Sequence, residues 1–232
     1  MMWPGGVAIG LSLVLAAPVH ALDCRLALVL ALDVSGSMSG ADDRPQRQGL
    51  AHALTAPAVV DAFPGGDPVA LHILQWSGQH SQFPILDGWV MVDAAADLTA
   101  IAQVVANSQR LHGEQGTATG SALLHAAGAL AEAPACSRQT VDVSSDGISN
   151  EGPEPGAIVH QPGPFDHVTV NALIVAPDPV EGKRENSQLV GWFIYNVLHG
   201  PEAFYILAFY FPDHERAMTH KLLRELEFPA LS

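Results

Sequence analysis

The sequence is poor in positive charge. Its 232 residues include 10 lysines and arginines against 24 aspartates and glutamates, which gives a formal net charge of −14. A surface this acidic repels phosphate backbones and anionic lipid head groups. The composition therefore argues against nucleic acid as a partner and against attachment to a membrane surface.

Long hydrophobic runs are missing after residue 21. Residues 1–21 are typical of a signal peptide, because residues 7–17 are almost all apolar or small and are too few to cross a bilayer comfortably. Val19-His20-Ala21 offers a small-x-small cleavage site. No lysine or arginine precedes the run, so an uncleaved anchor is the alternative. We expect a secreted or periplasmic protein with no membrane insertion after signal cleavage.

Cysteine is also scarce, and the chain has only Cys24 and Cys136. In an oxidising compartment two cysteines usually pair. Two separate buried thiols are the alternative, and the export signal makes that alternative the weaker one.

Residues 22–232 are long enough for one α/β domain with a full core and short for two. Strand-like apolar segments alternate with segments of helical spacing, which predicts a doubly wound, mainly parallel six-stranded sheet with helices on both faces. The predicted strands are 25–32, 68–76, 83–90, 139–144, 168–175 and 203–211. The predicted helices are 46–55, a short turn from Pro57, 93–108, 120–131, 188–198 and 213–226.

Three polar segments lie where ligands bind in such sheets, beyond the carboxyl ends of strands. Residues 33–37 (DVSGS) follow one buried strand, residues 116–120 (GTATG) open a helix, and residues 144–147 (SSDG) end another strand. Taken singly, each is an ordinary turn or helix cap. Together they supply two carboxylates and several hydroxyls, which suit Mg²⁺ or Mn²⁺, or Ca²⁺ in a loose cage.

The three segments resemble the metal-ion-dependent adhesion site (MIDAS) of von Willebrand factor A-type (VWA) domains. The resemblance extends to a branch of secreted bacterial VWA-like proteins whose function is unknown. It runs from about residue 24 to the C-terminus, and it is carried by RLALVLALDVSGSMS, QWSG, GTATGSAL, VDVSSDGISNEG and HGPEAF. One departure is the segment 150–166, where four prolines interrupt the helix that the branch usually has.

The resemblance implies roles for individual residues. Ser35 and Ser37 are similar to the hydroxyls that bind the metal directly, and Thr117 to the threonine that joins when a ligand binds. Asp33 and Asp146 are similar to the two aspartates that act directly or through water. The partner would be a protein whose Asp or Glu carboxylate fills the open position, and the last helix could shift when it does. The VWA strand order also places both cysteines at the end of the sheet opposite these residues, close enough to pair.

The sequence offers little support for an enzyme. Residues 36–40 (GSMSG) have the glycines of a nucleophile elbow, but methionine stands where the serine is needed. No paired histidines suit zinc, and no Walker lysine or Asp-x-Asp loop is present. We therefore expect a metal-dependent, adhesion-type protein-binding module that is not an enzyme, with Mg²⁺ ahead of Mn²⁺ and Ca²⁺. A metal-dependent hydrolase using the same Asp, Ser and Thr residues is the alternative.

Overall fold

The structure is a computed structural model, and it describes residues 23–37, 40–63, 67–110, 114–176, 182–210 and 213–227. The expected signal peptide lies outside the described residues, so that prediction stays open. No helix in the described part of the chain is long and apolar enough to cross a membrane.

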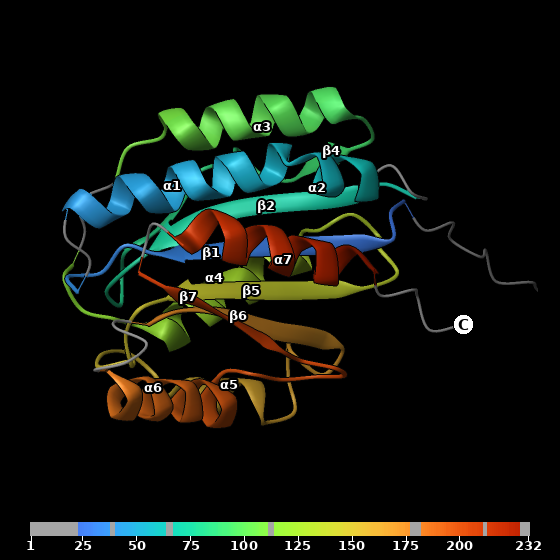
Figure 1. Cartoon of the computed structure of the whole chain (residues 1–232). Helices are drawn as coiled ribbons and strands as arrows, with labels where there is room; N and C mark the ends of the chain where they lie inside the picture. Colours follow the sequence, from blue (N-terminus) through green and yellow to red (C-terminus); the bar gives the residue numbers. More distant parts are fainter. Residues whose placement is uncertain are drawn as a thin grey trace, which may run out of the picture.

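A twisted sheet of seven strands forms the centre of the molecule (Figure 1). Five strands run parallel in the order β2-β1-β5-β6-β7, and two short strands pair antiparallel with β2. The carboxyl ends of the parallel strands point to the left in Figure 1. The strands are β1 (Leu26–Asp33), β2 (Val69–Trp76), β3 (Gln82–Pro84), β4 (Val90–Val92), β5 (Gln139–Ser145), β6 (Val168–Ala176) and β7 (Tyr205–Phe209).

Helices cover both faces of the sheet, which confirms the doubly wound α/β fold class. One face is covered by α1 (Gly40–Thr55), α2 (Pro57–Ala62), α3 (Ala95–Asn107) and α7 (His214–Glu227). The other is covered by α4 (Thr119–Ala131), α5 (Pro155–Val159) and α6 (Lys183–Asn196). Because both faces are buried, the central strands read as continuous apolar runs.

The side chains of β1 show how the two faces differ. Its leucines at 26, 28, 30 and 32 belong to the core beneath α1, α3 and α7. Its smaller residues at 27, 29 and 31 belong to the core beneath α4 and α6. Asp33 is the last residue of β1 and therefore lies at the carboxyl rim of the sheet.

Three elements, the 83–90 strand, α1 and α6, differ from the sequence-based expectation. The strand expected over 83–90 is two short strands, because Gly88 has a left-handed φ of 78° and the chain turns there. Helix α1 begins at Gly40 and α6 at Lys183, each several residues earlier than periodicity suggested. In the proline-rich segment the short helix α5 begins at Pro155. Proline is tolerated there because the backbone N–H of the first helical residue has no partner within the helix.

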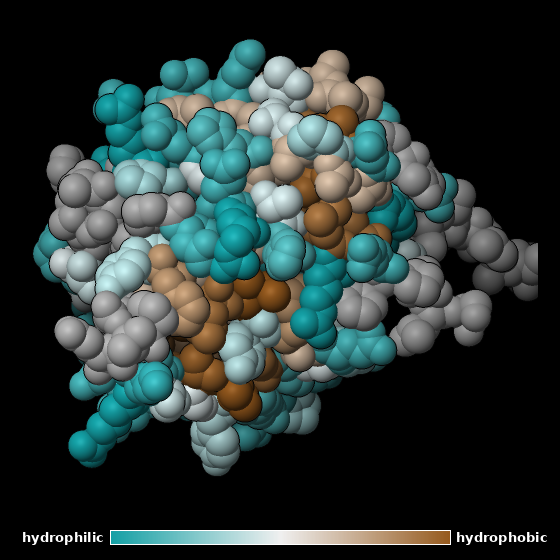
Figure 2. All heavy atoms as spheres, viewed as in Figure 1, coloured by the Kyte–Doolittle hydropathy of each residue, from teal (hydrophilic) through white to brown (hydrophobic). Residues whose placement is uncertain are grey.

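One edge of the sheet is β7, whose residues are mostly half-buried. Figure 2 shows a hydrophobic area on this side of the molecule, over the region between α7 and α6. At the amino end of the sheet, Cys24 and Cys136 form a disulfide that joins the start of β1 to the segment before β5.

Candidate metal centre

The sheet brings two of the three polar segments side by side. Strands β1 and β5 are parallel neighbours, with Leu32 opposite Ser144. Asp33 and Ser145 therefore come next to each other at the carboxyl end of the sheet, and the loops that follow them share one rim. The segment before α4 completes the rim, because the Ala118 N–H donates to Ser77 O beyond β2 at 2.9 Å.

The predicted site residues form a connected chain of oxygens. Thr117 Oγ1 donates to Ser35 Oγ at 3.0 Å, and Ser35 Oγ lies 3.1 Å from Ser37 Oγ. Ser37 Oγ then donates to Asp146 Oδ1 at 2.6 Å. Asp33 joins through its Oδ1, which accepts the Ser35 N–H at 2.7 Å. The structure thus brings all five predicted residues together, and whether they bind an ion stays a prediction.

The spacing of these oxygens fits a small hard cation. An octahedral Mg²⁺ with ligands at about 2.0–2.1 Å places neighbouring ligand oxygens about 2.9 Å apart. The three oxygen separations along the chain, 3.0, 3.1 and 2.6 Å, lie around that value. No group of three or more His, Cys, Asp or Glu side chains in the described ranges could hold a metal, so an ion here would depend on the hydroxyls.

The charges of the two aspartates also suit a bound cation. Asp33 is fully buried, and burial raises the pKa of its carboxyl to about 7. The hydrogen bond from Ser145 opposes this rise, and the nearby charge of Asp146 adds to it. The buried Asp33 carboxylate and the half-buried Asp146 carboxylate repel each other, and a bound dication would offset that repulsion. Ser37, by contrast, is exposed, so the site opens to solvent on one side.

Backbone contacts hold the loop after β1 in place. The Val34 N–H donates to Trp76 O at 2.7 Å, and the Gly36 N–H donates to Gln115 O at 2.8 Å. A Cβ on residue 36 would lie 2.8 Å from that same oxygen, so only glycine fits. Asn150 fixes Thr117, because its Oδ1 accepts the Thr117 N–H at 2.9 Å.

Ser145 is a residue of the site to which the sequence alone assigns no role. Its Oγ donates to Asp33 Oδ2 at 2.5 Å, so Ser145 orients the carboxylate that the metal would need. The serine is visible in the VSSDG segment, but only the pairing of β1 with β5 shows which aspartate it contacts. The role of Asn150 could not be predicted from the sequence either, because its contact with Thr117 joins residues 33 positions apart.

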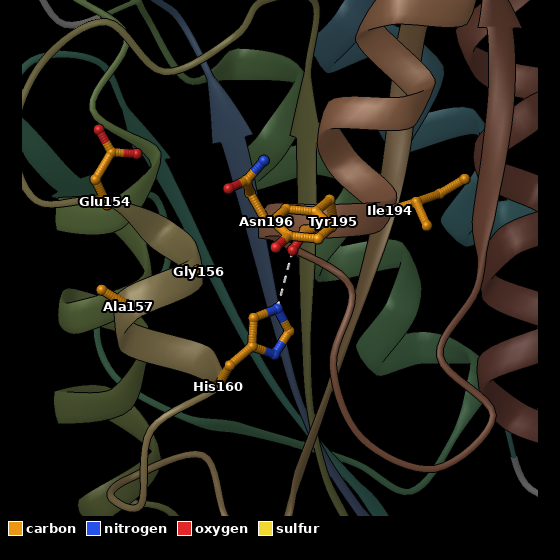
Figure 3. A pocket seen from close by; sticks show the side chains of 7 residues that line it. All are labelled: Glu154, Gly156, Ala157, His160, Ile194, Tyr195 and Asn196. Carbon is orange, nitrogen blue, oxygen red and sulfur yellow. Dashed lines mark hydrogen bonds between the residues drawn. The ribbon is translucent and has the colours of Figure 1, made fainter.

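A separate cavity of about 600 Å³ lies between α5 and the last turn of α6 (Figure 3). His160 borders it, with Nε2 donating to Tyr195 O at 3.0 Å. The residues that line it are Glu154, Gly156, Ala157, His160, Ile194, Tyr195 and Asn196, and none of them is a predicted metal ligand.

A family model described as "Protein of unknown function (DUF1194)" matches residues 23–230. The chain belongs to this family. Among curated proteins none matches this DUF1194 member. Its fold is the VWA-type α/β fold, as the sequence resemblance indicated.

Solved structures share this fold at low sequence identity. The pilus adhesin SpaC of Lactobacillus rhamnosus GG has a TM-score of 0.59 and 16% identity, over 88% of the DUF1194 chain and 31% of SpaC. The PilB minor pilin of Streptococcus sanguinis has 0.58 and 13%, over 91% and 62% of the two chains. Proximal thread matrix protein 1 of the mussel byssus, with a zinc-occupied MIDAS motif, has 0.54 and 18%, over 88% and 48%. The chain thus spans less than two thirds of each of these proteins.

Proposed function

We propose that this protein is a metal-dependent binding module of adhesion type. Asp33, Ser35, Ser37, Thr117 and Asp146 would hold one divalent cation, and an Asp or Glu carboxylate of a partner protein would complete its coordination. The observation that carries the proposal is the chain of oxygens from Thr117 through Ser35 and Ser37 to Asp146, at separations suited to one ion.

The composition of the site favours binding a carboxylate over holding the ion alone. Two aspartates balance the charge of a dication, and the hydroxyls add ligands without adding charge. The ion would keep enough Lewis acidity to attract a further anion, which an all-carboxylate cage would repel. The exposed side of Ser37 gives a partner access.

Oxygen ligands of this kind favour Mg²⁺, with Mn²⁺ and Ca²⁺ as alternatives. A secreted or periplasmic location follows from the expected signal peptide over 1–21, with one VWA-like domain over 22–232. The disulfide supports this location, because such bonds persist in oxidising compartments. Binding in place of catalysis is supported by the fold that the chain shares with a pilus adhesin and a thread matrix protein.

Calorimetric titration of Mg²⁺ and Mn²⁺ into the metal-free protein tests the metal site. Asp33→Ala removes a charge that holds the ion, so metal binding should fall sharply. Asp61→Ala, an exposed aspartate on α2, is the matched control and should bind like the wild type. Equal metal binding by Asp33→Ala and wild type would rule out the site.

A carboxylate probe tests the open position. Acetate added to the Mn²⁺-loaded protein should bind at the ion, and Thr117→Ala should weaken acetate binding more than metal binding. Ester, phosphate and peptide substrates given to the loaded protein should show no turnover. Hydrolysis that disappears in Asp33→Ala would instead establish the hydrolase.

A further inference from the structure

One guanidinium group contacts the backbone of the metal-binding loop. Arg110 Nη2 donates to Val34 O at 2.7 Å and to Ser35 O at 2.8 Å. These two carbonyls lie between Asp33 and Ser37. Arg110 therefore bonds directly to the peptide units on either side of Ser35, and one of these units supplies the N–H that donates to Asp33 Oδ1.

The segment that carries Arg110 is itself well anchored. It follows α3, and Gln75 on β2 donates through Nε2 to Gln109 O at 3.0 Å. Arg47 on α1 donates to Ser108 O one residue earlier. Contacts from a strand and from a helix thus fix the backbone before Arg110, so its half-buried guanidinium reaches the loop from a rigid base.

We propose that Arg110 is a positioning residue for the metal site, a role that rests on the proposed function above. By holding both carbonyls, it keeps the loop in the conformation in which the Ser35 N–H meets Asp33 Oδ1 at 2.7 Å. Without it, the Ser35 and Ser37 hydroxyls would have to be ordered when the ion binds. Contacts that orient metal ligands commonly contribute about 10- to 100-fold in metal affinity.

The charge of Arg110 makes this proposal distinguishable from a simple electrostatic effect. A cation beside a dication site repels the ion, so removing its charge should tighten metal binding if charge alone mattered. Positioning predicts the opposite sign, because losing the two hydrogen bonds frees the loop. A purely structural role predicts a lower melting temperature with no change in affinity of the folded protein.

The test is Mn²⁺ binding to the full chain, followed by electron paramagnetic resonance of the free ion. Arg110→Met keeps much of the side-chain length and removes charge and donors, and it should bind Mn²⁺ about 10- to 100-fold more weakly than wild type. Arg110→Lys retains a charged donor and should recover part of that loss. Arg224→Met removes the same charge from the last turn of α7, at the opposite end of the sheet, and should leave affinity unchanged.

Unchanged or tighter Mn²⁺ binding by Arg110→Met would overturn the positioning role while leaving the metal site intact. If the wild type itself bound no Mn²⁺, the proposed function would fail and the role of Arg110 with it. Melting curves of the metal-free variants are recorded alongside. If Arg110→Met fails to fold, the decision passes to Arg110→Lys, for which affinity equal to wild type would contradict a need for the two-carbonyl contact.

Discussion

At the scale of single residues, His214 is a buried ionisable group beside the candidate site. It is fully buried at the start of α7, and its Nε2 lies 3.5 Å from Ser144 Oγ. Burial lowers the pKa of this imidazole to about 4, although the nearby Asp213 carboxylate opposes the effect. The folded protein therefore binds the proton less readily than the unfolded chain does, whose histidine titrates near its usual value of about 6.5.

Because the pKa of His214 is lower in the folded state, acid should destabilise the protein. This stabilisation is present in full above about pH 6.5 and is lost as the pH falls toward 4, and the loss at pH 5 is about 2 kcal/mol. His214→Met should remove this part of the pH dependence. Urea unfolding of the metal-free protein at pH 7.5 and pH 5 measures it, and identical pH dependence in variant and wild type would contradict the assignment.

Individual site residues could be predicted from the sequence only where the motif is local. Asp33, Ser35 and Ser37 belong to one five-residue loop, and Asp146 follows its strand directly. Ser145 and Arg110 could not be assigned, because their contacts cross 112 and about 75 residues of sequence and depend on strand order and on the path after α3. Local patterns identify candidate ligands, whereas the residues that orient the ligands become visible only in the folded chain.

At the scale of elements, α7 is attached to the sheet through buried charges. Lys221 Nζ lies 2.9 Å from Asp142 Oδ2 on β5 and 2.9 Å from Glu225 Oε1 on its own helix. Asn171 on β6 donates to the same Glu225 oxygen at 2.8 Å. Burial raises the pKa of Asp142 to about 6, and the Lys221 ammonium opposes that rise. The lysine is therefore needed to balance carboxylates that have no access to water.

Lys221→Met should leave these carboxylates buried and uncompensated, and it should lower the free energy of unfolding by about 3–5 kcal/mol. Adding Asp142→Asn and Glu225→Gln should recover much of the loss, because no buried charge then remains. Lys183→Met, at an exposed lysine on α6, is the control. Urea unfolding measures all of these variants, and a loss below about 1 kcal/mol for Lys221→Met would contradict the account.

The edge strand β7 is partly closed by two side chains, Asp213 just before α7 and Arg216 in its first turn. The Ala172 N–H donates to Phe204 O and the Tyr210 N–H to Ala176 O, so even-numbered residues bond to β6 and odd-numbered ones face outward. Outward groups are occupied at two places: Arg216 donates to Leu207 O at 3.4 Å, and the Phe209 N–H donates to Asp213 Oδ2 at 3.1 Å. Such contacts discourage pairing with another strand.

Arg216→Ala should therefore increase self-association through β7, since Leu207 O loses its side-chain donor beside the hydrophobic area in Figure 2. Arg184→Ala removes the same charge from an exposed position on α6 and should not change association. Sedimentation velocity over a range of protein concentrations measures the difference. Equal sedimentation of Arg216→Ala and wild type would show that the contact does not protect the edge.

Periodicity predicted the elements whose burial is uniform along their length. β1, β5 and β6 are buried on both faces and were located within one or two residues. The prediction of one strand over 83–90 was wrong, because the hydrophobic pattern does not show that Gly88 adopts a left-handed backbone conformation. Helix α6 begins earlier than periodicity predicts, because its first turn, Lys183 to Asn186, is mostly exposed and carries little hydrophobic pattern.

At the scale of the whole molecule, the candidate site and the disulfide lie at opposite ends of the sheet. All five parallel strands end at the rim that carries Asp33 and Asp146. The bridge between Cys24 and Cys136 lies at the amino end, where it joins positions 112 residues apart in the sequence. Stability supplied by the bridge and metal binding at the rim should therefore be separable.

Cys24→Ala with Cys136→Ala should lower the free energy of unfolding by about 2–5 kcal/mol, since the unfolded chain loses a constraint on a long loop. Mn²⁺ affinity of the folded double variant should match the wild type. Chemical unfolding and Mn²⁺ titration below the melting temperature measure the two quantities. A large loss of affinity in well-folded variant protein would show that the two ends of the sheet are coupled.

A crystal structure of the wild-type protein grown with Mn²⁺, with the ion located by its anomalous scattering, would test the proposed metal site most directly. We expect one strong peak at the rim, about 2.0–2.3 Å from hydroxyl oxygens of Ser35 and Ser37, with the carboxylates of Asp33 and Asp146 beside it and bonded directly or through water. Absence of a peak there from crystals saturated with Mn²⁺, or a peak held only by other residues, would contradict it.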